Sequence, residues 1–344
     1  MSERFFGILD DLAGRSRNFP VFHFALAGCV FRVCAKTEPL AQLLAAALRD
    51  RVVPATRPAD VTIFAWDMEP SPVSWACPEW KVVERWSRRE PVRASDGTGM
   101  FFFDPIGGMV SLYGRGRRQA GVWFRDAATL PIWIAAAPFL RVLDSWFTAR
   151  GKMLCHGAAI AKHGVAALIV GPGGAGKSTL ALRSLDAGFG YLGDDYVLLE
   201  PATPLPIVYS VYGSGKLVAS DLEAGSPAEA AVFQEPADRT EKSFLRVEGS
   251  SIFDSAPLAA VFEPSIGDGE WPKLEATSSG GALRCILPSA LRQLPGEEQG
   301  KLSILTRVVT VPCYRLHLSR DHARNLAAID AELQVQARRL GLSQ

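Results

Sequence analysis

The sequence has almost no excess of charge of either sign. Its formal net charge is +1, and charged residues make up 21% of its 344 residues. A protein that binds nucleic acid or an anionic membrane through bulk electrostatics needs an excess of positive charge. The basic residues here are scattered along the chain. We therefore expect neither nucleic acid nor a membrane as a partner.

The sequence also lacks paired cysteines and long apolar runs. Its six cysteines include no C-x-x-C pair, which argues against a zinc ribbon or a disulfide scaffold and favours buried thiols in a reducing compartment. The apolar stretch 130–140 is broken by Pro131 and Pro138, and it is shorter than the roughly 20 residues of a spanning helix. The N-terminal segment MSERFFGILDDLAGR carries acids and does not resemble a secretion signal. These absences predict a soluble, cytoplasmic protein.

The chain is long enough for two domains, and its character changes near residue 126. Residues 1–125 contain strand-like segments and one amphipathic helix, at 38–51. Two apolar segments, 99–103 and 109–113, flank a turn-forming sequence and predict a hairpin. This part contains no chemical motif. We expect it to form a small α+β domain whose role the sequence does not give.

Residues 126–344 carry all the motifs and are expected to form the second domain. They begin with a helix-like segment at 130–149, followed by a strand of small residues at 153–160. The run VAALIV at 165–170 is continuously apolar, which is typical of a strand buried on both faces. The first motif with a predicted chemical role follows directly after this strand.

A glycine-rich segment, GPGGAGKST, follows the apolar strand and matches the pattern G-x-x-x-x-G-K-[ST] in full. Glycines let the backbone turn so that successive N–H groups face phosphate oxygens. Lys177 places an ammonium on the outer phosphates, and Ser178 offers a hydroxyl to Mg²⁺. A helix is expected to begin at Lys177 and to end at Gly188. The motif predicts that the phosphates of a nucleoside triphosphate bind, together with Mg²⁺, to one loop: Gly171, Gly173, Gly174, Ala175, Gly176, Lys177, Ser178 and Thr179.

Two adjacent aspartates, Asp194 and Asp195, follow that helix at the entrance to another apolar segment. Phosphoryl transfer to a hydroxyl needs a carboxylate that contacts Mg²⁺, and usually another that orients or deprotonates the acceptor. We expect both acids at the same end of the sheet as the loop, dividing these roles. Ser178 and Asp194 are the expected metal ligands, although the sequence does not decide which aspartate is the base.

Taken together, these segments resemble one family. His156-Gly157, the apolar strand, GPGGAGKSTLAL and LGDDYVLL are similar to the catalytic core of HPr kinase/phosphorylase and its relatives. The relatives include the lasso-peptide kinases, and the core is shared with phosphoenolpyruvate carboxykinase. The resemblance is specific over about residues 150–200 and extends to VPCYRL at 311–316. It implies an α/β fold with a P-loop kinase core, to which residues 1–125 would add the smaller N-terminal α+β domain expected above.

The resemblance implies a role for each matching residue. Lys177, Asp194 and Asp195 would be catalytic, and His156 would lie beside the γ-phosphate or the acceptor. Such kinases place cations downstream to steady the transferred charge, where this chain has Lys216, Lys242 and Arg246. A homo-oligomer is a further implication, because hexamers occur among the bifunctional members.

Two departures separate this chain from the members that act on HPr. It lacks their arginine-glycine signature segment, and Thr179 stands where the bifunctional enzymes carry an acid. We therefore expect an ATP-dependent kinase that phosphorylates a serine in a peptide or small protein, as a peptide-tailoring kinase of the lasso type does. Two alternatives stay open. One is a small-molecule kinase, for free serine or of the carboxykinase type, and the other is a nucleotide-gated binding or chaperone module.

Overall fold

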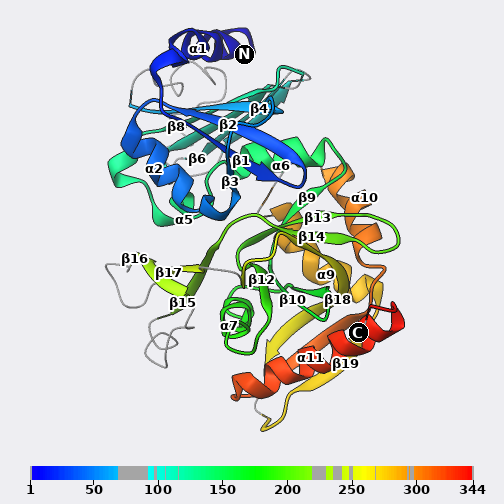
Figure 1. Ribbon diagram of the computed structural model, residues 1–344. Coiled ribbons are helices and arrows are strands. Elements are labelled where there is room, and N and C mark those ends of the chain that lie inside the picture. Colours follow the sequence, from blue (N-terminus) through cyan, green and yellow to red (C-terminus); the bar gives the residue numbers. More distant parts are fainter. Residues whose placement is uncertain are drawn as a thin grey trace. The chain divides into compact units, whose positions relative to one another are not determined.

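The computed structural model describes residues 2–68, 92–96, 99–104, 106–114, 116–218, 230–234, 242–247, 251–267, 269–292, 294 and 298–342. The chain divides into two compact units, Met1–Trp146 and Phe147–Gln344. Both units combine sheets with helices (Figure 1). The predicted α/β class is therefore confirmed in its general form.

The first unit is built on an eight-stranded sheet with the order β3-β1-β2-β4-β8-β7-β6-β5. Its strands are β1 (Val21–Leu26), β2 (Cys29–Ala35), β3 (Val52–Val53), β4 (Val61–Asp67), β5 (Val92–Asp96), β6 (Gly99–Asp104), β7 (Met109–Gly114) and β8 (Gln119–Phe124). The predicted hairpin is confirmed, because β6 and β7 pair antiparallel. The apolar segment at 21–33 forms a second hairpin, since Ala27 and Gly28 turn the chain with positive φ.

Among the described residues, four helices accompany this sheet: α1 (Ser2–Arg15), α2 (Glu38–Ala46), α5 (Ile132–Ala135) and α6 (Leu140–Thr148). Helix α1 packs Leu9 and Leu12 into an aromatic-rich cluster that includes Trp66 and Phe103. Helix α2 starts where the Thr37 side chain accepts a hydrogen bond from a backbone N–H of the first turn, and it ends before the predicted limit at residue 51.

The two compact units divide after Trp146, whereas the sequence predicts a domain boundary at 125/126. The Trp146 ring meets Phe31 and Tyr113 edge to face, with ring centroids 6.1 Å apart in both pairs. Phe139 stacks on Phe24 at 6.1 Å. These aromatic contacts hold the segment up to Trp146 in the first unit. The single helix predicted at 130–149 is broken into α5 and α6, because Phe139 adopts a positive φ of 62° between them.

The second unit contains a nine-stranded mixed sheet. Along the order β12-β10-β11-β18-β14-β13-β9, strand β18 also pairs with β20, and β20 with β19. The strands are β9 (Met153–His156), β10 (Ala158–Lys162), β11 (Val165–Ile169), β12 (Gly190–Gly193), β13 (Tyr196–Glu200), β14 (Ile207–Ser210), β18 (Ser255–Ile266), β19 (Lys273–Thr277) and β20 (Cys313–Leu318). A three-stranded sheet is formed by β15 (Ser214–Val218), β16 (Ala230–Gln234) and β17 (Lys242–Val247).

Helices cover both faces of strand β11. Its alternate residues Val165, Ala167 and Ile169 join a core with α7 (Lys177–Arg183) and α11 (His322–Arg339). Ala166 and Leu168 join the opposite core with α9 (Ser279–Leu287) and α10 (Glu298–Val308). The prediction of a strand buried on both faces is confirmed. The glycine-rich segment therefore follows the C-terminal end of a well-packed central strand.

Two predicted elements of this unit are shorter than expected. Helix α7 begins at Lys177 as predicted but ends at Arg183, and the chain then turns until Gly188, which has a positive φ of 71°. The strand predicted at 153–160 is split at Gly157, whose N–H donates to the carbonyl oxygen of Asp195 at 3.1 Å. This break brings the end of β9 next to the aspartate pair.

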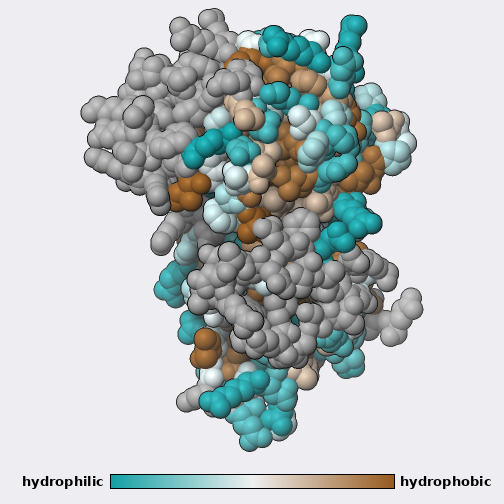
Figure 2. Space-filling model, turned by 90° about the vertical axis from the view of Figure 1, so that its left-hand side faces the viewer, coloured by the Kyte–Doolittle hydropathy of each residue, from teal (hydrophilic) through white to brown (hydrophobic). Residues whose placement is uncertain are grey.

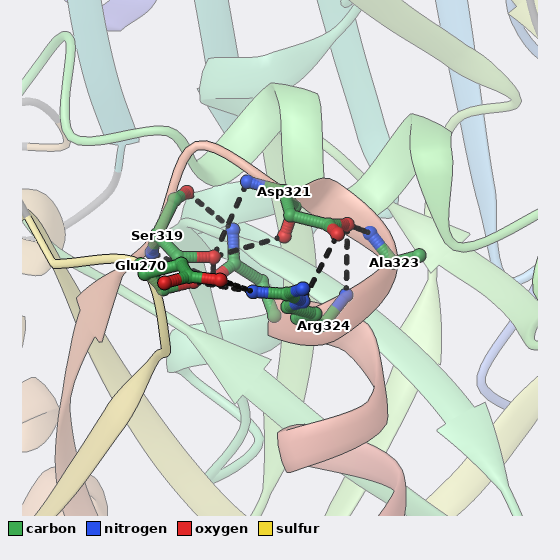
Figure 3. Close-up of polar contacts among 6 residues, drawn as sticks. Glu270, Ser319, Asp321, Ala323 and Arg324 are labelled. Carbon is green, nitrogen blue, oxygen red and sulfur yellow. Dashed lines mark hydrogen bonds and ion pairs between the residues drawn. The ribbon is translucent and has the colours of Figure 1, made fainter.

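Helix α11 begins at a polar cap (Figure 3). The Asp321 carboxylate accepts hydrogen bonds from the N–H groups of Ala323 and Arg324 at 2.9 and 3.2 Å. The Arg324 guanidinium in turn reaches the Glu270 carboxylate at 3.2 Å. These contacts fix the start of α11 beside the loop that joins β18 and β19.

The described surface is chemically mixed. Hydrophobic and hydrophilic residues lie among one another on the face drawn in Figure 2, and Trp271 and Ile266 are 66% and 81% exposed. No helix in the described ranges is long and apolar enough to cross a membrane. The described cysteines Cys29, Cys34, Cys155, Cys285 and Cys313 are free thiols, and Cys77 lies outside the described residues.

Candidate functional site

The glycine-rich segment forms the loop between β11 and α7. Three of its glycines have positive φ: 150° at Gly171, 80° at Gly174 and 94° at Gly176. Residues other than glycine are strained in this backbone conformation, because they carry a Cβ atom. Gly176 is further restricted by space, because a Cβ atom there would lie 2.8 Å from Leu318 Cδ1. The pattern of glycines in the sequence is thus required by the backbone of this loop.

The Lys177 side chain folds back over the loop. Its ammonium donates to the carbonyl oxygens of Gly171 and Pro172 at 3.0 and 2.9 Å, and the residue is only 7% exposed. A buried cation is costly unless it is hydrogen-bonded, and the loop carbonyls supply that bonding. The positive charge is therefore held at the start of the loop, in a fixed position for an anion.

The two aspartates lie in the bend between β12 and β13 and have different environments. Asp194 is 2% exposed, and its Oδ2 accepts a hydrogen bond from the backbone N–H of Lys216 at 2.9 Å. Burial, followed by the neighbouring charge of Asp195, raises the pKa of the Asp194 carboxyl to about 7, although hydrogen bonds from Ser178 and Lys216 oppose this shift. Near neutral pH, Asp194 is thus poised between its two protonation states.

Asp195 is paired with a lysine and lies near a histidine. Its Oδ2 is ion-paired with the Lys216 ammonium, and its Oδ1 lies 3.8 Å from His156 Nε2. The side chains of Asp195, Lys216 and His156 are 19%, 22% and 18% exposed, so the cluster is half-buried but reachable. The His156 ring packs edge to face on Tyr196, with centroids 5.4 Å apart. This contact orients the imidazole towards the carboxylate.

These residues line one cavity of about 400 Å³, which we call the phosphate cavity: His156, Gly173, Gly174, Gly176, Lys177, Ser178, Thr179, Asp194, Asp195 and Lys216. The structure therefore brings together the loop, both aspartates and the histidine that the sequence singled out. Of the three downstream cations, Lys216 is in the cavity and Arg246 is not among its lining residues. The side chain of Lys242 lies outside the described part of the structure.

The phosphate cavity contains groups suited to Mg²⁺. Asp194 Oδ1 is buried and accepts no hydrogen bond from the described residues, and the Ser178 hydroxyl bonds to the same carboxyl group. Mg²⁺ prefers oxygen ligands and is commonly held by one or two protein groups together with substrate phosphates and water. No group of three or more His, Cys, Asp or Glu side chains among the described residues is arranged for a metal. The residues present thus fit a cation that arrives with a nucleotide.

A second cavity, of about 620 Å³, lies on the other side of the start of the loop. Its lining includes Gly171, Pro172, Gly173, Glu263, Thr277, Gly281, Arg284, Cys285, Pro288 and Arg315. Its arginines suggest calling it the arginine cavity. No motif of the sequence predicts this cavity, because its charged residues come from β18, α9 and β20, and no local pattern connects them.

Comparisons with known proteins add little to this geometry. No family model matches the chain, and no curated protein matches its sequence. Among solved structures, the HPr(Ser) kinase/phosphatase from Coxiella burnetii matches at 12% sequence identity, with a TM-score of 0.29. The match covers 55% of this chain and 98% of that chain.

Proposed function

We propose that this protein is a P-loop kinase that transfers the γ-phosphate of ATP to a hydroxyl group. The observation that carries the proposal is the phosphate cavity, where the glycine loop, a buried lysine and two unlike aspartates meet. A loop of this sequence between a buried strand and a helix is typical of phosphate binding. An acidic pair in the same cavity supplies the carboxylate that contacts Mg²⁺ and the second one that usually orients or deprotonates the acceptor hydroxyl.

In this proposal the loop and Lys177 bind the triphosphate. Backbone N–H groups from Gly173 to Thr179 hold phosphate oxygens, and the Lys177 ammonium balances the charge that develops on the outer phosphates. Ser178 and Asp194 hold Mg²⁺, which neutralises phosphate charge when it is bound. The buried Oδ1 of Asp194 supports this role, because a bound cation would satisfy it.

Asp195 is the proposed base for the acceptor. It is more exposed than Asp194, and it bonds to Lys216 and lies close to His156 rather than to the loop serine. A carboxylate in this position can orient the acceptor hydroxyl and take its proton as the new bond to phosphorus forms. Lys216, held by Asp195, is positioned to balance charge on the transferred group.

The acceptor that we propose is a serine in a peptide or small protein. This part of the proposal rests on the resemblance of residues 150–200 to peptide and protein kinases of the HPr kinase type. A peptide-tailoring role, use of ATP, the cytoplasm as the site of action and assembly into a homo-oligomer belong to the same proposal.

The test is phosphoryl transfer from γ-labelled ATP with Mg²⁺. Serine-bearing peptides, free serine and HPr are offered as acceptors, with Lys177→Ala as the inactive control. We expect label on a peptide with the wild type and none with the variant. Label on free serine alone would replace the peptide acceptor with a metabolite. Tight ATP binding without transfer to any acceptor would refute the kinase and favour a nucleotide-gated module.

A further inference from the structure

The arginine cavity begins where the phosphate cavity ends. Gly173 lines both cavities, and it has no side chain that could separate them. An added Cβ atom at Gly173 would meet no atom within 4 Å, so the space around it is open. A ligand that reaches Gly173 from the arginine cavity therefore arrives at the edge of the phosphate cavity.

The Lys177 ammonium indicates how a bound triphosphate would run along the loop. In loops of this sequence, the lysine reaches the β- and γ-phosphates. Its ammonium here contacts the carbonyl oxygens of Gly171 and Pro172, and both residues line the arginine cavity, while Lys177 itself lines the phosphate cavity. In a triphosphate bound in this way, the γ-phosphate would lie nearer the arginine cavity than the α-phosphate. Ser178 and Thr179, at the other end of the loop, do not line it.

The charges of the arginine cavity favour an anion. Arg315 is ion-paired with Glu263 at 3.2 Å, which fixes its guanidinium and balances its charge. Arg284 is exposed and has no ion pair within the part of the chain that the structure describes. Its guanidinium offers the planar fork that matches a carboxylate with two parallel hydrogen bonds. One arginine is therefore balanced inside the protein, and the other is available to a ligand.

We propose that the arginine cavity binds the phosphate acceptor and recognises a carboxylate of that acceptor through Arg284. This inference rests on the proposed kinase function and names the chemical class of its substrate. Arg284 holds the carboxylate while the hydroxyl of the same molecule extends past Gly173 to the γ-phosphate. The carboxylate belongs either to a small hydroxy acid or to an acidic residue near the target serine.

Two pairs of probes separate these sources. L-serine is a small molecule with a carboxylate, and L-serinamide has a neutral amide in its place. The peptides acetyl-Gly-Ser-Asp-amide and acetyl-Gly-Ser-Asn-amide differ only in a side-chain carboxylate. Binding of each probe is measured calorimetrically on the full-length protein with Mg²⁺ and a non-hydrolysable ATP analogue. Transfer from γ-labelled ATP is measured in parallel on wild type, Arg284→Gln, Arg284→Lys and Arg338→Gln. Arg338 is an exposed arginine on α11, away from both cavity linings.

We expect the wild type to bind the carboxylate member of at least one pair about 10- to 100-fold more tightly than its neutral partner. Arg284→Gln should abolish this preference without changing the Kd of ATP, Arg284→Lys should restore part of it, and Arg338→Gln should behave as the wild type. If Arg284-dependent binding occurs without transfer, the kinase fails but the carboxylate site stands. Equal binding within both pairs would overturn the proposal. An Arg284→Gln effect on ATP affinity would also overturn it, since it would place the nucleoside in this cavity.

Discussion

The two cavities on either side of Gly173 hold their charges in different ways. In the phosphate cavity, Lys177 and Asp194 are 7% and 2% exposed and are fixed by backbone groups. In the arginine cavity, the Arg315 side chain is 50% exposed and Arg284 is exposed as well. Burying charge costs free energy and is tolerated where the surroundings are organised for it. The phosphate cavity thus holds its central charges buried and hydrogen-bonded, whereas the arginine cavity leaves its arginines exposed to solvent.

The largest expected effect comes from the proposed base in the phosphate cavity. Asp195→Asn should lower the transfer rate by about 10²- to 10⁴-fold, because the amide cannot accept the proton of the acceptor hydroxyl. The Kd of ATP should change little, because Asp195 is paired with Lys216 and not with the loop. Asp186→Asn, at an exposed position in the turn after α7, is the control. Unchanged transfer in Asp195→Asn would remove Asp195 from the mechanism.

The next effect concerns stability and pH. Burial and the neighbouring charge of Asp195 raise the pKa of Asp194 to about 7 in the folded protein, from an ordinary value of 3.8. Between these values the folded carboxyl keeps a proton that the unfolded one has lost, so stability falls as pH rises towards 7. In nucleotide-free protein, the free energy of unfolding should fall by roughly 1–3 kcal/mol from pH 5 to pH 8 through this group. Urea unfolding of Asp194→Asn should show a smaller fall than the wild type. An equal fall in both proteins would contradict the raised pKa.

A third effect tests the shape of the loop. Gly176→Ala should lower the free energy of unfolding by about 1–2 kcal/mol, because the new methyl group meets Leu318 at a positive φ. It should also weaken ATP binding. Gly173→Ala is the matched control for stability, since its methyl group meets no atom within 4 Å. Thermal unfolding of both variants measures the difference, and equal values would show that the loop relaxes freely.

The smallest effect is expected in the arginine cavity. Glu263→Gln removes the partner of Arg315, and a half-exposed ion pair contributes at most about 1 kcal/mol. The free energy of unfolding should therefore change little. The carboxylate member of a probe pair should bind more tightly, because Arg315 is released. A large loss of stability would mean that this ion pair contributes far more than its exposure implies, which would contradict the comparison of the two cavities.

The sequence was informative where the determinants are local. The apolar strand, the glycine loop and the start of α7 at Lys177 follow from neighbouring residues, and the structure has the strand and the helix start as predicted. The hairpin of β6 and β7 is also local. Such features depend on backbone conformation and on burial that a short segment already encodes.

The remaining features depend on contacts between distant segments. The division of the compact units after Trp146 depends on the packing of Trp146 on Phe31 and Tyr113, which joins residues far apart in the chain. Nothing in the local sequence distinguishes Lys216 from other lysines, yet its N–H and ammonium bond to the two aspartates. The arginine cavity likewise forms only when β18, β20 and α9 are assembled. Tertiary pairing of this kind leaves no periodic signal in the sequence.

The most direct test of the account is equilibrium binding of ATP, with and without Mg²⁺, to the wild type and to Lys177→Ala. The account predicts saturable binding at one site that is tighter with Mg²⁺, and an affinity at least about tenfold weaker in Lys177→Ala because a charge-assisted hydrogen bond is lost. Equal affinities in the two proteins, or no binding to the wild type, would contradict the assignment of the 171–179 loop to the phosphates.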